Sequence, residues 1–126
     1  MRDLLLVGAG GFVGAIARHA MGGWLMGLAT QPRFPFGTLA VNVLGCALIG
    51  VFAAFAEAIP SLNGPARLLL VTGLLGGFTT FSAFGLETVL MLRRGDTALA
   101  AAYVAASLVL GLIAVWIGMK AIALPR

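Results

Sequence analysis

The sequence predicts an all-α membrane protein with four transmembrane helices, the third of them broken, that assembles as an antiparallel, dual-topology homodimer. Hydrophobic residues make up 61% of the 126 residues, 10% are charged, and the mean hydropathy is +1.09, a composition that excludes an ordinary soluble domain. Charged residues and prolines divide the chain into apolar segments of about 20 residues or more, the length that a transmembrane helix needs. Cationic residues are divided equally between the two ends of these segments, which is the observation behind the dual topology.

The apolar segments form a single transmembrane domain over residues 1–126. Each pair of neighbouring segments is joined by a short connector with turn-forming residues such as Pro, Gly, Asn or Asp. Short connectors make consecutive helices antiparallel, so we expect both chain termini on the same side of the membrane. The predicted spans are residues 4–28, 37–59, 68–92 and 98–124.

The third segment contains residues that interrupt a helix near its middle. In GLLGGFTTFSAF, residues 73–84, a pair of glycines is followed by Thr79, Thr80 and Ser82. Backbone amides and carbonyls that leave a helix at membrane depth cannot face lipid, because unsatisfied polar groups are costly there. Such groups line a cavity or hold an ion, and they mark ion sites in transport proteins. A helix-packing surface is the alternative, because GLLGG also matches the GxxxG contact motif.

The cationic residues predict no preferred orientation in the membrane. The side of the termini carries Arg2, Arg67, Lys120 and Arg126, and the other side carries Arg18, Arg33, Arg93 and Arg94. Because Lys and Arg near the membrane set orientation, this balance predicts insertion both ways and an antiparallel homodimer. Two opposed copies have the symmetry that inverted repeats give to one chain. A single orientation fixed by weak loop signals is the alternative, and the net charge of +4 gives no argument for a nucleic-acid partner.

Phe81 and Phe84 are candidates for contact with an ion. They are three residues apart and share one face if the helix resumes after Thr80. An aromatic ring is electropositive at its edge, so ring edges turned inward give an anion a weakly attractive contact that excludes water. Two Phe residues at helical spacing are also typical of simple packing, and both interpretations stay open.

Polar side chains also occur in the second and fourth segments. Thr38 lies one turn before Asn42, whose amide needs a partner in the bilayer. Asn42 therefore either joins helices or faces a polar path. Tyr103 and Ser107 are four residues apart and predict a thin polar stripe whose donors replace the water around an anion.

The first segment combines two packing motifs with a charge. Gly10 with Gly14, and Gly23 with Gly27, match the GxxxG pattern and predict close helix contacts. Arg18 falls between them, inside the apolar stretch. A charge at this depth is a candidate functional residue, and snorkelling to the lipid headgroups is its alternative role.

Glu87 is the second charged candidate inside an apolar segment, after the predicted break. The chain has one cysteine and one histidine, so a Cys/His metal site is not expected. It also lacks a nucleotide-binding fingerprint, a Walker motif and a catalytic triad. We therefore do not expect an enzyme.

Three motifs resemble the CrcB or Fluc fluoride channel family, and the resemblance extends over essentially the whole chain. They are GGFVGAIAR at residues 10–18, GTLAVNVLG at 37–45 and GLLGGFTTFSAF at 73–84. The resemblance implies antiparallel homodimers in the bacterial inner membrane that passively export fluoride from the cytoplasm and so lower its toxicity. The chain departs from the family at Ala83, where a threonine is common.

The resemblance also implies roles for individual residues. A sodium ion at the dimer interface would be held by the backbone carbonyls of Gly76 and Thr79. The implied fluoride pathway contains Phe81, Phe84, Asn42, Tyr103 and Ser107, with Ser82 and, as a weaker candidate, Thr38. Arg18 and Glu87 are structural or vestibule candidates.

The alternative function is a small proton-coupled multidrug exporter of dual topology, which shares the size and the four helices. That chemistry requires a carboxylate in the first helix that alternates between proton and cation. Residues 4–28 contain no carboxylate, and Glu87 alone is left for this role.

Overall fold

The computed structural model describes residues 1–30 and 33–122, and every regular element in these ranges is a helix. The prediction of an all-α membrane protein is confirmed, because four helical spans are long and apolar enough to cross a membrane. The elements are α1 (Arg2–Leu28), α2 (Phe36–Ala58), the 3₁₀ helix η1 (Pro60–Asn63), α3 (Pro65–Arg67), the π-helix η2 (Leu68–Leu75), α4 (Gly76–Phe78), α5 (Phe81–Arg93) and α6 (Thr97–Ala121). The third span comprises α3, η2, α4 and α5.

The observed helix ends differ by a few residues from the predicted ones. The third span begins at Pro65, which occupies a first-turn position where a missing amide hydrogen has no consequence. The fourth span ends at Ala121, and its predicted end at residue 124 lies outside the described residues. Hydropathy marks the apolar stretch rather than the hydrogen-bonded helix, which explains these shifts.

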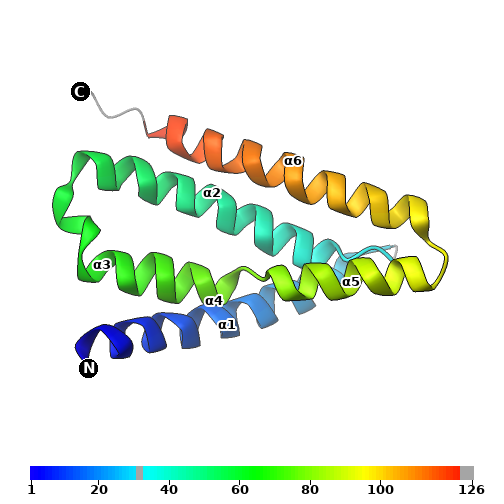
Figure 1. Cartoon of the computed structure of the whole chain (residues 1–126), viewed down its shortest axis with the longest axis horizontal. Helices are drawn as coiled ribbons and strands as arrows, with labels where there is room; N and C mark the ends of the chain where they lie inside the picture. The colour runs from blue at the N-terminus through cyan, green and yellow to red at the C-terminus, as the bar shows by residue number, and fades with distance from the viewer. Residues whose placement is uncertain (31–32, 123–126) are drawn as a thin grey trace.

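The four spans run side by side along the long axis of the molecule (Figure 1). The start of α1 and the end of α6 lie at the same end, as the short connectors predict (Figure 1). Two helix pairs dominate the packing: α1 lies along η2 and α4, and α2 lies along α6. The third span thus lies between α1 and the α2–α6 pair.

Glycines permit the close approach within the α1 pair. A Cβ atom at Gly10 would meet the carbonyl oxygen of Leu69, and one at Gly14 would meet that of Leu74. The packing motif predicted at these two glycines is confirmed. The motif at Gly23 and Gly27 makes no such contact within the chain, because a Cβ there meets no heavy atom within 4 Å among the described residues, and its contact with a second copy stays a prediction. Sequence spacing alone does not say which face of a helix has a neighbour.

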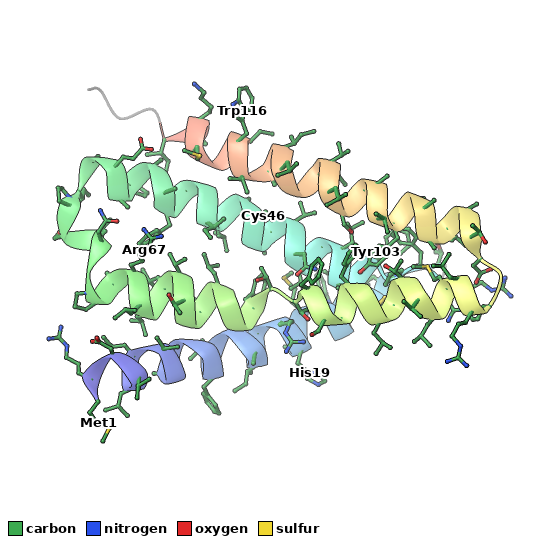
Figure 2. The ribbon with its side chains drawn as sticks, viewed as in Figure 1. Met1, His19, Cys46, Arg67, Tyr103 and Trp116 are labelled. Atoms are coloured by element: carbon green, nitrogen blue, oxygen red, sulfur yellow. The ribbon has the colours of Figure 1, made fainter. Side chains whose placement is uncertain are left out.

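Burial is concentrated where α5 and α6 meet the start of α2. Tyr103 is fully buried there with Met91 and Ala100 (Figure 2). Large apolar side chains elsewhere point outward, such as Trp116 of α6, which is 63% exposed and projects away from the bundle (Figure 2). An apolar exterior of this kind needs lipid or a partner to cover it.

Candidate ion pathway

Two residues with extended backbone, Thr79 and Thr80, separate α4 from α5 in the third span (Figure 1). Their φ and ψ angles are −85° and 157° for Thr79, and −149° and 114° for Thr80. The preceding η2 is a π-helix, a rare form that is frequent at functional sites. Backbone polar groups are therefore released from helical pairing in the middle of a membrane-length segment.

The side chain of Asn42 on α2 supplies hydrogen-bond partners at this point. The Thr80 amide donates to Asn42 Oδ1 over 2.8 Å, and Asn42 Nδ2 donates to the Thr80 carbonyl over 3.0 Å. Thr80 also caps α5, because its Oγ1 accepts a hydrogen bond of 3.2 Å from the Ala83 amide. Asn42 therefore joins two spans, which was one of the two roles left open by the sequence.

Two backbone carbonyls lose their helical donors at the same place. In a continuous α-helix the amides of Thr80 and Ala83 donate to the carbonyls of Gly76 and Thr79, four residues earlier. Here both amides donate to side-chain oxygens instead. These are the two carbonyls at which the resemblance implies a cation site. Carbonyls released in this way are ligands that unwound membrane helices offer to sodium.

Arg18 reaches the same region from α1. Its Nε donates to the carbonyl of Gly77 over 3.2 Å, and the hydrogen bond is partly buried. Snorkelling to headgroups is therefore not the whole role of this side chain. The Arg18 guanidinium therefore lies beside the released backbone.

A groove of about 360 Å³ lies between α2, the third span and α6. Its walls are mostly apolar, with a few polar groups, which is typical of a binding site. Four predicted pathway residues and both predicted cation ligands line it: Asn42, Phe81, Phe84, Ser107, Gly76 and Thr79. The groove therefore brings together residues that the sequence places on three different spans.

The rings of Phe81 and Phe84 lie together at this groove. Their centroids are 5.5 Å apart and their planes are tilted by 38°, which confirms the shared face predicted from their spacing. Phe81 is 84% exposed in the single chain, so its ring is not part of a packed core. Contact between these rings and an ion remains a prediction.

Ser107 lines the groove and carries an unpaired hydroxyl. Within residues 1–30 and 33–122, its Oγ is buried and has no hydrogen-bond partner. An unsatisfied buried hydroxyl destabilises a fold by about 1–3 kcal/mol. The hydroxyl therefore has no competing partner among these residues.

Glu87 lies in a second, smaller cavity of about 190 Å³. Both of its carboxylate oxygens accept hydrogen bonds of 2.7 Å, Oε1 from Thr38 Oγ1 and Oε2 from Tyr103 Oη. Tyr103 also packs on Phe84, with ring centroids 5.2 Å apart. Tyr103 therefore contacts both Phe84, which lines the groove, and Glu87, which lines the small cavity.

Some predicted site residues are not brought together. Tyr103 and Ser107 do not form one stripe, because the Tyr103 hydroxyl binds Glu87 whereas Ser107 lines the groove. Ser82 is exposed, and its Oγ lies 3.4 Å from Thr80 Oγ1. Thr80 itself was missed as a site residue, although a threonine just before a resuming helix is a signal for an N-cap.

Comparison with known proteins agrees with this architecture. The family model described as "CrcB-like protein, Camphor Resistance (CrcB)" matches residues 5–119. A protein of Methylobacillus flagellatus named "Fluoride-specific ion channel FluC" is 44% identical over 120 residues, 95% of this chain and 94% of that protein. A protein of the same name from Rhizobium etli is 46% identical over 119 residues, 94% of this chain and 94% of that protein. One from Nitrobacter winogradskyi is 44% identical over 121 residues, 93% of this chain and 92% of that protein. The chain is therefore a multi-pass membrane protein that belongs to the CrcB-like family.

Proposed function

We propose that this protein is a fluoride-specific ion channel that passively exports fluoride from the cytoplasm across the bacterial inner membrane. Relatives named as such channels share 44–46% identity with nearly the whole chain. The observation that carries the proposal is the groove at the interrupted third span, where Asn42, Phe81, Phe84 and Ser107 meet. Export of this kind lowers the toxicity of fluoride.

The chemistry of the groove suits a small, strongly hydrated anion. Fluoride enters a narrow space only if donors replace its water. In this proposal the donors are the Ser107 hydroxyl, which has no partner among the described residues, and the second hydrogen of the Asn42 amide. Ring edges of Phe81 and Phe84 add weakly electropositive contacts that exclude water. Selectivity against larger halides then follows from the width of the groove and the position of these donors.

A second copy of the chain in the opposite orientation completes the channel in this proposal. The groove is open on one side in the single chain, and the large, exposed ring of Phe81 stands at it. A partner that covers this side closes the groove into a path. The equal division of Lys and Arg between the two ends supports insertion in both orientations.

A sodium ion at the dimer interface is the proposed cofactor. The carbonyls of Gly76 and Thr79 fit this role, because the amides that pair with them in a continuous helix donate to Asn42 and Thr80 instead. A bound cation satisfies these oxygens and fixes the backbone between α4 and α5. No step of fluoride movement requires the ion itself to move.

Membrane potential is a sufficient driving force. Moving one charge across the membrane is worth about 2.3 kcal/mol per 100 mV. A negative cell interior therefore drives fluoride outward without coupling to protons. This distinguishes the proposal from a proton-coupled multidrug exporter, for which residues 4–28 contain no carboxylate.

Fluoride efflux from liposomes tests the proposed function. Purified protein is reconstituted with internal fluoride, the voltage is clamped with potassium and valinomycin, and an electrode records release. Rapid, voltage-driven loss of fluoride without loss of chloride is the expected result. Absence of fluoride loss from folded, dimeric protein contradicts it, and loss that requires a proton gradient favours the exporter.

A further inference from the structure

Two arginines stand at the rim of the small cavity that contains Glu87. The cavity lies at the end of the molecule opposite the termini, where α1 and α5 end and α2 begins. Arg33, Thr38, Glu87 and Arg94 are among the residues that line it. Arg33 comes from the connector before α2, and Arg94 follows α5 directly, so two distant segments bring positive charge to one opening.

Asp96 holds both arginines in place. Its Oδ2 lies 3.3 Å from Arg94 Nε, and its Oδ1 lies 3.9 Å from Arg33 Nη1. Asp96 occupies the N-cap position of α6, yet in the described part of the chain its carboxylate makes no capping hydrogen bond. Aspartate is a favoured capping residue, but here its carboxylate contacts the arginines and does not cap the helix.

Among the described residues, the guanidinium groups contact only the Asp96 carboxylate. The Asp96 side chain is only 18% exposed, whereas those of Arg33 and Arg94 are 75% and 53% exposed in the single chain. A guanidinium has five N–H donors in a fixed plane, and a single contact to a carboxylate leaves the others available. The arginines therefore present donors and positive charge toward water at the cavity opening.

The charges of the cavity are balanced rather than uniformly positive. Asp96 offsets part of the arginine charge at the rim, and Glu87 lies deeper, where it accepts hydrogen bonds from Thr38 and Tyr103. A site on a conduction path has to attract the ion strongly enough for entry and weakly enough for release. Because the arginines are much more exposed than Asp96, an anion that arrives from water meets the positive charge first.

We propose that this cavity is an anion-binding antechamber, in which Arg33 and Arg94 collect fluoride from water and Asp96 limits how tightly they hold it. The inference rests on the proposed channel function. It adds a site at one end of the path, where Tyr103 contacts both Glu87 of the cavity and Phe84 of the groove. The expected ligand is a small monovalent anion. The arginines offer it hydrogen-bond donors, and the carboxylate of Glu87 in the same cavity disfavours ligands of higher negative charge.

Fluoride currents measured over a range of fluoride concentrations test the antechamber. In low ionic strength, an Arg33→Gln/Arg94→Gln channel is expected to carry current on the order of tenfold smaller than the unmodified channel at low fluoride. The difference is expected to vanish at saturating fluoride and in high salt, which screens the arginines. Asp96→Asn is expected to increase the current at low fluoride.

Arg93→Gln is the matched control. Arg93 is exposed at the same end of α5 but is not among the described residues that line the cavity, so its removal takes away one positive charge, as Arg94→Gln alone does, without changing the opening. Arg94→Lys, which keeps the charge, is expected to retain most of the current at low fluoride. If the double variant does not assemble, Arg33→Gln alone leaves the contact between Arg94 and Asp96 intact.

Two results would overturn the antechamber. One is a double variant with unchanged currents at every fluoride concentration. The other is a decrease in current that is equal at low and saturating fluoride and is accompanied by a lower thermal unfolding midpoint. That result is expected if the arginines only stabilise the fold. Absence of current from the unmodified protein is a different outcome, because it contradicts the proposed channel function itself.

Discussion

Asn42 of α2 and Thr80 of the third span exchange two hydrogen bonds, one in each direction. A side-chain amide has one acceptor and two donor hydrogens, so it pairs with a peptide group as a second backbone segment does. This exchange lets Thr80 adopt an extended conformation in a membrane span without leaving its amide and carbonyl unsatisfied. The same pairing directs the Thr80 amide away from the Gly76 carbonyl.

Asn42→Asp is expected to lower fluoride flux while the dimer stays assembled. The substitution keeps the acceptor for the Thr80 amide but places a carboxylate oxygen against the Thr80 carbonyl. Leaving a buried acceptor unsatisfied costs about 1–3 kcal/mol. We therefore expect fluoride efflux from liposomes to decrease by about tenfold or more. Asn63→Asp is the control, because Asn63 also donates to a backbone carbonyl, that of Ala56, but lies in η1 outside the groove. Equal flux in the Asn42→Asp and unmodified proteins would remove Asn42 from the pathway.

Phe81→Ile is expected to lower flux while the dimer stays assembled. The substitution keeps an apolar side chain but removes the electropositive ring edge at the groove. A barrier higher by about 1 kcal/mol corresponds to a decrease of about fivefold in flux. The dimer is expected to stay assembled, because isoleucine keeps an apolar side chain toward the partner copy. Phe12→Ile on the outward face of α1 controls for the loss of an exposed ring in lipid. Unchanged flux together with a lower unfolding midpoint would make Phe81 a packing residue.

Gly14→Ala is expected to destabilise the contact between α1 and the third span. Its Cβ would meet the backbone carbonyl of Leu74, which cannot move aside as a flexible side chain does. Overpacking of this kind costs about 1–3 kcal/mol, so the thermal unfolding midpoint in detergent should fall by several degrees. Gly8→Ala is the matched control on the same helix, because a Cβ there meets no heavy atom within 4 Å in the described parts of the chain. Equal midpoints for the two variants would contradict the packing.

Sodium is expected to stabilise the assembled protein specifically. If the carbonyls of Gly76 and Thr79 bind the ion in the folded state only, a sodium concentration 100 times its dissociation constant raises the free energy of unfolding by about 2.7 kcal/mol. The unfolding midpoint should therefore be higher in sodium chloride than in N-methylglucamine chloride at equal ionic strength. Equal midpoints in the two salts, at every sodium concentration, would argue against the cation site.

The number of spans and the identity of several groove residues could be predicted from the sequence. A bilayer requires long apolar helices, and few polar residues are tolerated within them, so each of these residues is informative. Asn42 and Ser107 were found for this reason, and both line the groove. The extended residues Thr79 and Thr80 fall in the segment where glycines and hydroxyls are concentrated.

The partners of these residues could not be predicted, because they depend on how the helices are rotated and placed. Thr38, Glu87 and Tyr103 come from three helices and meet through two hydrogen bonds that no spacing in the sequence indicates. Gly10 and Gly23 begin identical GxxxG patterns, yet only the first faces a neighbouring helix among the described residues. In both cases the rotation and placement of the helices decide which residues meet.

The reversal potential of the reconstituted channel tests the central claim most directly. A planar bilayer containing the protein separates two solutions that differ in fluoride concentration, with chloride distributed in the opposite gradient. A selective, passive fluoride channel predicts a reversal potential at the equilibrium potential of fluoride, which does not move when a proton gradient is added. A reversal potential near that of chloride, or one that follows the proton gradient, would contradict the account.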